Sequence, residues 1–146
     1  MKTIQRKYET DYDKEVELKL GEKYGNYVRS LGYEIEMENQ GFLSTYDFKV
    51  YYKRTFIKWL EVKKKSGFFS DSEIIPITKW NFAKQSKIPC WMLIERKNRA
   101  KLFNITALIK NGQGQEREIK RRVDQPEGSR KVVFFPTASG RDIYYL

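Results

Sequence analysis

The chain of 146 residues is 40% hydrophobic and 15% aromatic, which suffices for the core of one domain and argues against disorder. Its net charge of +10 favours a polyanionic partner, with nucleic acid ahead of an anionic membrane surface. The chain has no histidine and only one cysteine, Cys90, which excludes histidine-based catalysis, zinc–histidine sites, disulfide frameworks and thiolate zinc sites.

The first part of the chain predicts an arm, a helix and a strand. Residues 1–10 are polar and are expected to form a flexible arm. Apolar residues at spacings of three and four predict a helix over 11–32 that stops at Gly32. Within that range 14–20 stay open, because their alternating apolar residues also fit a strand. Residues 33–37 alternate enough to form the first strand of the core.

Residues 44–65 predict a β-hairpin, and the functional interpretation depends on it. We expect two strands around a turn at 53–55, with Asp47 at the start of the first and Glu61 near the end of the second. Antiparallel partners lie only ~5 Å apart, so the hairpin should bring the two carboxylates together. Side chains alternate between the faces of a strand, so Lys63 should share the face of Glu61.

The second half of the chain predicts a loop, a helix, two strands, a basic loop and two closing strands. These lie at 66–72, 76–87, 88–95, 101–109, 111–130, 132–135 and 143–146. The chain therefore predicts an α/β fold whose elements follow the order helix, three strands, helix, strand.

Two carboxylates beside a lysine suit the cleavage of phosphodiester bonds. Because the chain lacks histidine, hydrolysis must use carboxylates, lysine and a metal bound through oxygen. Carboxylates can hold Mg²⁺, or Mn²⁺ in its place, and such an ion keeps several waters. A metal-bound water is acidified, and a nearby lysine can orient it or stabilise charge on a phosphate. Ordinary surface charges on exposed strand faces are the alternative interpretation.

The spacing of Asp47, thirteen residues, Glu61, one residue and Lys63 resembles the signature of the PD-(D/E)XK nuclease superfamily. The proline that often precedes the aspartate is replaced by Tyr46. The predicted order of elements is similar to the core of that superfamily. The resemblance implies a restriction-endonuclease-like αβββαβ core, a mixed central sheet flanked by helices, with extra C-terminal strands. It implies a single nuclease-like domain over 1–146.

The resemblance also implies roles for residues of the hairpin. Asp47 and Glu61 would bind one or two metal ions, and the backbone carbonyl of Val62 would complete the shell. Lys63 would position the attacking water and stabilise the charge that develops on the phosphate.

Two helical positions are further candidates by resemblance. Members of the superfamily add a glutamate from the first helix. Glu22 is preferred for that role, although it falls opposite the apolar stripe, and Glu17 is the alternative if the helix starts early. Lys79, in the second helix, would face the scissile phosphate as basic residues do in some relatives, with a solvated lysine as the simpler interpretation.

A basic cluster within 111–130 is a candidate clamp for backbone phosphates. Such contacts give affinity without sequence information and make binding strongly salt dependent. A solvated basic face is the alternative. The residues expected to bind nucleic acid, besides Lys79, are Arg117, Lys120, Arg121, Arg122 and Arg130.

We therefore expect a metal-dependent nuclease that acts on DNA in preference to RNA, with a structure-selective, junction-resolvase-like enzyme as one version. A non-catalytic nucleic-acid-binding protein on the same fold is the alternative. The superfamily leads us to expect a homodimer. The sequence shows no signal-peptide core and no apolar run of membrane-spanning length, which predicts a cytoplasmic protein (in the host cytoplasm if viral) without a membrane partner.

Overall fold

A computed structural model describes residues 11–41, 44–97, 99–120 and 129–145, so the predicted arm at the N-terminus lies outside the described residues. The elements follow one another in this order: α2 (Asp11–Ser30), β1 (Ile35–Asn39), β2 (Phe48–Tyr52), β3 (Thr55–Lys64), β4 (Ser72–Pro76), α3 (Ile77–Gln85), β5 (Cys90–Arg96), β6 (Arg99–Asn104), α4 (Ile105–Lys110), β7 (Gln115–Lys120), β8 (Ser129–Pro136), the 3₁₀ helix η1 (Thr137–Ser139) and β9 (Arg141–Ile143).

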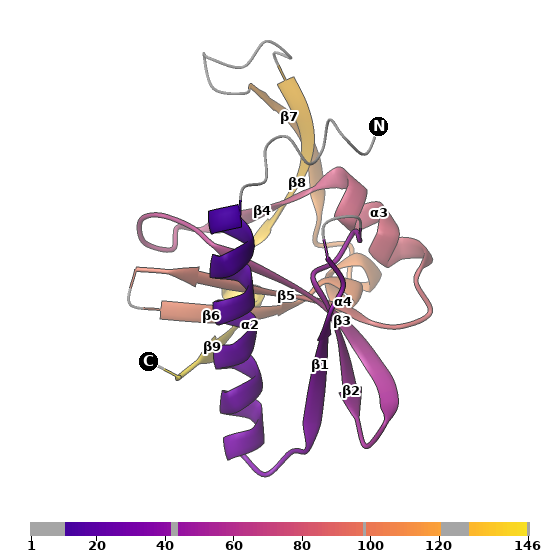
Figure 1. Ribbon diagram of the computed structural model, residues 1–146. Coiled ribbons are helices and arrows are strands. Elements are labelled where there is room, and N and C mark those ends of the chain that lie inside the picture. The colour runs from indigo at the N-terminus through magenta and orange to yellow at the C-terminus, as the bar shows by residue number, and fades with distance from the viewer. Residues whose placement is uncertain (1–10, 42–43, 98, 121–128, 146) are drawn as a thin grey trace.

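The described strands form two sheets (Figure 1). The larger has the order β1-β2-β3-β5-β6-β9, in which the β3–β5 pair is parallel and the other pairs are antiparallel. The smaller has the order β4-β8-β7 and is antiparallel throughout. The predicted α/β class, with a mixed sheet, helices and extra C-terminal strands, is therefore confirmed.

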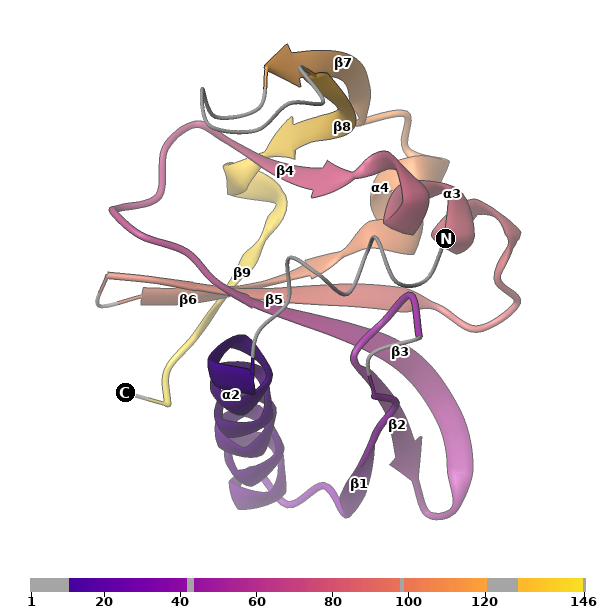
Figure 2. The ribbon, with the colours of Figure 1, turned by 45° about the horizontal axis from the view of Figure 1, so that its top comes forward.

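The elements pack in layers around the large sheet, as Figure 2 shows. Helix α2 covers one face, and the small sheet, α3 and α4 cover the other. Leu60 and Val62 of β3 belong to the core on the α2 side. Because side chains alternate along a strand, Glu61 and Lys63 are directed to the opposite side, toward the layer of α3 and the small sheet.

Helix α2 is continuous across the stretch whose conformation the sequence left open. Leu20 and Tyr24 are buried against the large sheet, so the strand alternative for 14–20 is wrong. The helix ends at Ser30, just before the predicted stop at Gly32, whose φ of +98° suits a residue without a side chain. The N–H of Tyr33 donates to the Val28 carbonyl at 3.5 Å, which satisfies one of the last carbonyls of the helix.

The predicted hairpin is confirmed, with a turn of two residues. Lys53 and Arg54 connect β2 to β3, and both have positive φ, +48° and +67°. A turn with two positive φ values matches the right-handed twist of the flanking strands and fixes their register.

Several parts of the second half differ from the predictions, including the closing strand at 143–146, which the structure places at Arg141–Ile143 as β9. Residues 73–75, which the sequence left unassigned between the loop at 66–72 and the helix at 76–87, form the strand β4 together with Ser72 and Pro76, and Pro76 is tolerated at the end of this edge strand. The strand predicted over 101–109 breaks after β6, because the Asn104 side chain accepts the Ala107 N–H and starts α4. The basic loop predicted over 111–130 contains β7, which pairs with β8.

Candidate active site

Asp47 and Glu61 meet where β2 begins and β3 nears its end. The hairpin pairs Phe48 with Leu60, so Asp47 comes directly before the paired strand and lies beside Glu61. Both residues are buried, with 8% and 5% of their surface exposed, and each carboxylate lies within range of the other's charge. The hairpin therefore brings the two carboxylates together as the sequence predicted.

The backbone of β3 holds the Asp47 side chain in place. Its Oδ2 accepts a hydrogen bond from the Val62 N–H at 2.9 Å, beyond the point where β2 supplies backbone partners. The N–H and C=O of one strand residue point to the same side, so the Val62 carbonyl faces the side of Asp47. Three oxygen-bearing groups, two carboxylates and one carbonyl, thus gather at this point of the hairpin.

Lys79 of α3 completes the cluster. Its Nζ lies 2.7 Å from Oε2 of Glu61 and donates to the Thr45 carbonyl at 2.6 Å. The hydroxyl of Tyr46 donates to the backbone carbonyl of Lys79 at 3.0 Å, which ties the start of α3 to the segment before Asp47. The interpretation of Lys79 as a solvated lysine is wrong, because only 19% of its side chain is exposed and Nζ lies against the Glu61 carboxylate, whereas its contact with a scissile phosphate stays a prediction.

The spacing of Lys79 from the buried residues of α3 could have revealed its position. Trp80 and Ala83 are the buried residues of α3, and Lys79 lies four residues before Ala83, beside the same stripe. A lysine on the border of a buried stripe reaches the core edge more readily than one on the opposite side of the helix.

Burial perturbs the acid–base properties of the cluster. It raises the pKa of Glu61 to about 8, with Asp47 acting in the same direction and Lys79 against it. Burial lowers the pKa of Lys79, but the carboxylates of Glu61 and Asp47 outweigh it and hold that pKa above its ordinary value. Groups perturbed in this way concentrate at functional sites, although structural ion pairs also produce them.

The oxygen atoms of the cluster fit a hard divalent cation in part. Oε1 of Glu61 is buried and has no hydrogen-bond partner among the described residues, which leaves one carboxylate oxygen available to a ligand. No group of three or more metal-ligating side chains is found in the described part of the chain. Mg²⁺ needs no such group, because it binds through one or two carboxylates and keeps several waters.

Lys63 lies on the same face of β3 as Glu61 but outside the buried cluster. Its side chain is exposed, and within the described ranges it makes no ion pair. It lies two residues, or roughly 7 Å of strand, beyond Glu61. Lys63 is therefore free to meet a molecule that approaches the carboxylates from solvent.

Of the two glutamates considered in α2, Glu17 is the one near the cluster. Its charge contributes to the raised pKa of Lys79, and its side chain pairs with Lys14 at 3.5 Å. Glu22 is exposed, as its position opposite the apolar stripe indicated. The preference for Glu22 is therefore not supported by the placement of the two residues.

The predicted basic cluster belongs to a different part of the molecule, the ribbon of β7 and β8 that projects at the top of Figure 1. Arg117 and Arg130 are exposed on this ribbon, and the Arg117 guanidinium lies 4.7 Å from the centre of the Phe134 ring. Lys120 ends β7, and Arg121 and Arg122 lie outside the described residues.

Comparison with known proteins yields no match, either among protein-family models or among curated proteins. Among the described helices, none combines the length and apolar character needed to cross a membrane. The fold and the cluster of Asp47, Glu61 and Lys79 are therefore the features that indicate a function.

Proposed function

We propose that the chain is a metal-dependent nuclease that hydrolyses phosphodiester bonds, with DNA as its substrate rather than RNA. The observation that carries this proposal is the buried pair of Asp47 and Glu61, anchored by the Val62 N–H and faced by Lys79. Burying two neighbouring carboxylates is costly, and Oε1 of Glu61, which finds no hydrogen-bond partner among the described residues, adds to the cost. A cation-binding role gives this arrangement a use.

The order of the elements supports the same proposal. Helix α2, strands β1 to β3, helix α3 and the parallel strand β5 follow the αβββαβ order of a restriction-endonuclease-like core, with β4 inserted before α3. We assign the remaining strands to additions around that core. This order and the spacing of Asp47, Glu61 and Lys63 together support the proposed membership of the PD-(D/E)XK superfamily.

Each residue of the site has a distinct role in this proposal. Asp47, Glu61 and the Val62 carbonyl hold the metal, which when bound would supply an acidified water and polarise the phosphate. Lys63 orients the attacking water and stabilises charge on the phosphate. Lys79 positions the Glu61 carboxylate through their ion pair.

The charge balance supports a nucleic-acid substrate. A net charge of +10 attracts a polyanion, and Arg117 and Arg130 on the β7–β8 ribbon are exposed to contact backbone phosphates. Such contacts release counterions, so affinity should fall steeply as salt concentration rises.

The test is a cleavage assay with Mg²⁺ or Mn²⁺ on linear duplex, single-stranded, flapped and four-way-junction DNA, with RNA counterparts. Asp47→Asn and Glu61→Gln keep the side-chain shapes and should each lower cleavage by about 10²-fold or more. Glu34→Gln, at an exposed glutamate before β1, is the matched control and should leave cleavage unchanged. Cleavage that survives both site variants, or needs no metal, would contradict the proposal.

A second function, nucleic-acid binding without cleavage, is favoured by one observation. The Lys79 ammonium already neutralises Oε2 of Glu61 at 2.7 Å, and this reduces the negative charge that would attract a metal cation. In that case wild type would bind the panel but cut none of it at any metal concentration. Binding would also survive Asp47→Asn, since no carboxylate would then contact the nucleic acid.

A further inference from the structure

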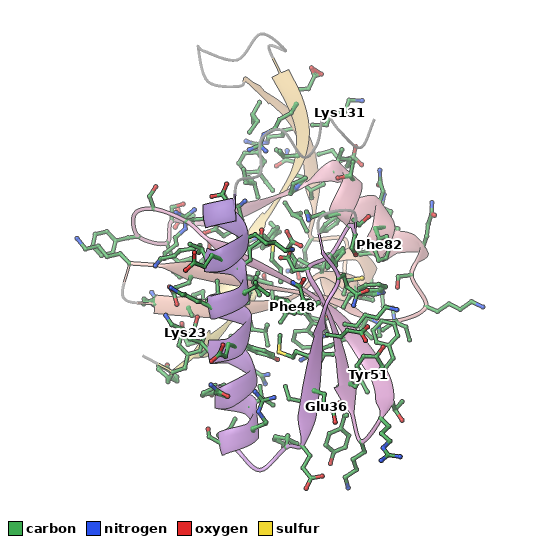
Figure 3. All side chains as sticks on the ribbon, in the orientation of Figure 1. Lys23, Glu36, Phe48, Tyr51, Phe82 and Lys131 are labelled. Atoms are coloured by element: carbon green, nitrogen blue, oxygen red, sulfur yellow. The ribbon has the colours of Figure 1, made fainter. Side chains whose placement is uncertain are left out.

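An aromatic strip extends from the candidate site along the β2–β3 hairpin. The rings of Tyr51 and Phe56 lie 5.6 Å apart between centroids, and those of Phe56 and Trp59 lie 5.2 Å apart. Trp59 in turn meets Phe82 of α3 at 5.4 Å. In Figure 3, Tyr51 and Phe82 lie along one side of the molecule, whereas Lys23 of α2 lies on the other.

The strip shares a face with the candidate active site. Lys49 pairs with Trp59 across the hairpin, and Tyr51 pairs with Phe56 beyond a bulge, so these four residues line one side. Trp59 lies two residues before Glu61 on β3, which sets the two side chains roughly 7 Å apart on the same face. A strand of nucleic acid that crossed the strip would therefore lead directly to the carboxylates.

Packing of the core accounts for only half of the strip. Trp59 and Phe82 border the core on the side of the small sheet. Tyr51 and Phe56 pack against neither of the two core clusters, although both rings are only partly buried. Core packing therefore does not explain why these two adjacent rings lie here.

The hairpin that carries the strip is basic, whereas Glu36 and Glu38 of the neighbouring strand β1 pair with Tyr51 and Lys49 on the same face. The thirteen residues between Asp47 and Glu61 include four basic residues and no acidic one. The Lys49 ammonium lies over the strip itself, 5.3 Å from the centre of the Phe56 ring and 5.4 Å from that of Trp59. Aromatic rings interleaved with cations suit bases and phosphates of a nucleic acid.

We propose that Tyr51, Phe56 and Trp59 form a stacking platform for the bases of a single-stranded segment, with Lys49 contacting its backbone phosphate. The inference rests on the proposed nuclease function and specifies its substrate. Base faces are accessible to aromatic side chains only where the bases are unpaired and unstacked. The preferred substrate is therefore nucleic acid with an unpaired segment next to the scissile bond, such as a flap or an overhang, and a fully paired duplex is a poor one.

The experiment measures binding of a labelled single-stranded DNA oligonucleotide, and of the blunt duplex of the same sequence, to the full chain in EDTA. Tyr51→Leu and Phe56→Leu keep apolar bulk but remove the ring, and each should weaken single-strand binding about tenfold while leaving duplex binding unchanged. Tyr51→Phe keeps the ring and should retain affinity. Tyr33→Leu is the control, because this exposed tyrosine contacts Tyr52 rather than the strip.

Tryptophan fluorescence gives an independent readout. Stacking of a base on Trp59 should quench part of the emission of wild type on addition of the single strand, and Trp59→Phe should lose that part. Equal loss of single-strand and duplex binding in the Leu variants, or no loss in either, would overturn the platform. Cleavage that persists in wild type would then leave the nuclease proposal standing. A wild type that neither binds nor cuts would overturn both.

Discussion

The Lys79 ammonium of α3 lies 2.7 Å from Oε2 of Glu61. Lys63 projects from the same face of β3 as Glu61 and makes no ion pair in the described part of the chain. The first lysine is bound to the candidate site from α3, and the second is exposed beside it. Two lysines in such different surroundings should respond differently to substitution, which allows their roles to be separated.

Replacing Lys63 should affect chemistry alone. Lys63→Ala removes the group proposed to orient the attacking water, and the cleavage rate should fall about 10²-fold. Because the side chain is exposed and unpaired among the described residues, Tm and metal-free affinity for oligonucleotide should stay near the wild-type values. Lys64→Ala is the matched control, because Lys64 is the next residue along β3, points to the other face of the sheet and pairs with Glu95 at 3.7 Å. Equal cleavage by the Lys63 variant and wild type would remove Lys63 from the mechanism.

The pH dependence of stability should report the Glu61–Lys79 pair. The pKa of Glu61 rises on folding to about 8, so between about pH 4.5 and pH 8 the folded chain binds more protons than the unfolded chain. The free energy of unfolding contributed by Glu61 is therefore fully present below pH 4.5 and falls as pH rises through 8. The slope cannot exceed about 1.4 kcal/mol per pH unit, the value for one proton.

Two variants test this sign in EDTA by chemical denaturation across the pH range. Glu61→Gln should abolish the decline, because the amide does not titrate. Lys79→Met should extend the decline to higher pH, because Lys79 lowers the pKa of Glu61 in the wild type. The opposite result would be a wild type whose stability increases with pH and a Glu61→Gln variant that shows no such increase. That result would show that the Glu61 carboxylate is stabilised in its charged form.

The hairpin and its two carboxylates could be predicted because their signals are local. Alternation of side chains, a short turn and the distance between Asp47 and Glu61 along the chain are sufficient to place both groups together. The same holds for α2, whose apolar spacing and Gly32 mark its face and its end.

Two of the missed features, strand β4 and the contact of Lys79, depend on contacts between distant parts of the chain. Strand β4 exists because residues 72–76 pair with 132–136 of β8, a partner that no local pattern specifies. The contact of Lys79 with Glu61 depends likewise on how α3 docks against the large sheet. Local propensity could place Lys79 beside a buried stripe but could not identify the carboxylate opposite it.

A buried ion cluster should make β4 essential for stability. Glu73 is 1% exposed and accepts hydrogen bonds from Lys65 at 3.0 Å and from Arg96 at 2.6 and 3.1 Å, which joins the small sheet to the end of β3 and to β5. Glu73→Gln leaves two cations without their counter-charge and should lower the free energy of unfolding by about 3 kcal/mol, the lower end for a broken buried pair because both cations stay partly exposed. Glu36→Gln, at an exposed site, should change it by less than about 0.5 kcal/mol. Urea denaturation of both variants measures the difference, and equal stabilities would show that the cluster contributes no net stabilisation.

The packing of α2 on the large sheet should depend on the absence of a side chain at Gly21. A Cβ at this position would lie 2.3 Å from Cζ of Phe48, whose ring lies between α2 and the sheet (Figure 3). In a free helix Gly→Ala stabilises by about 1 kcal/mol, but forcing a methyl group into a packed contact costs roughly 1–3 kcal/mol. Gly21→Ala should therefore destabilise the chain, and the measurement is again urea denaturation.

Gly25→Ala is the matched control for this prediction, one helical turn further along the same face. Its Cβ would meet Nη2 of Arg29 at 2.9 Å and Sδ of Met37 at 3.2 Å, both at the ends of flexible side chains that can move. This variant should be as stable as wild type or more so. Adding Phe48→Leu should recover part of the loss caused by Gly21→Ala, because the smaller side chain vacates the space of the ring, and the double-mutant cycle gives that coupling directly. If Gly21→Ala were to stabilise the chain as much as Gly25→Ala, α2 would lie further from the sheet than the contact with Phe48 requires.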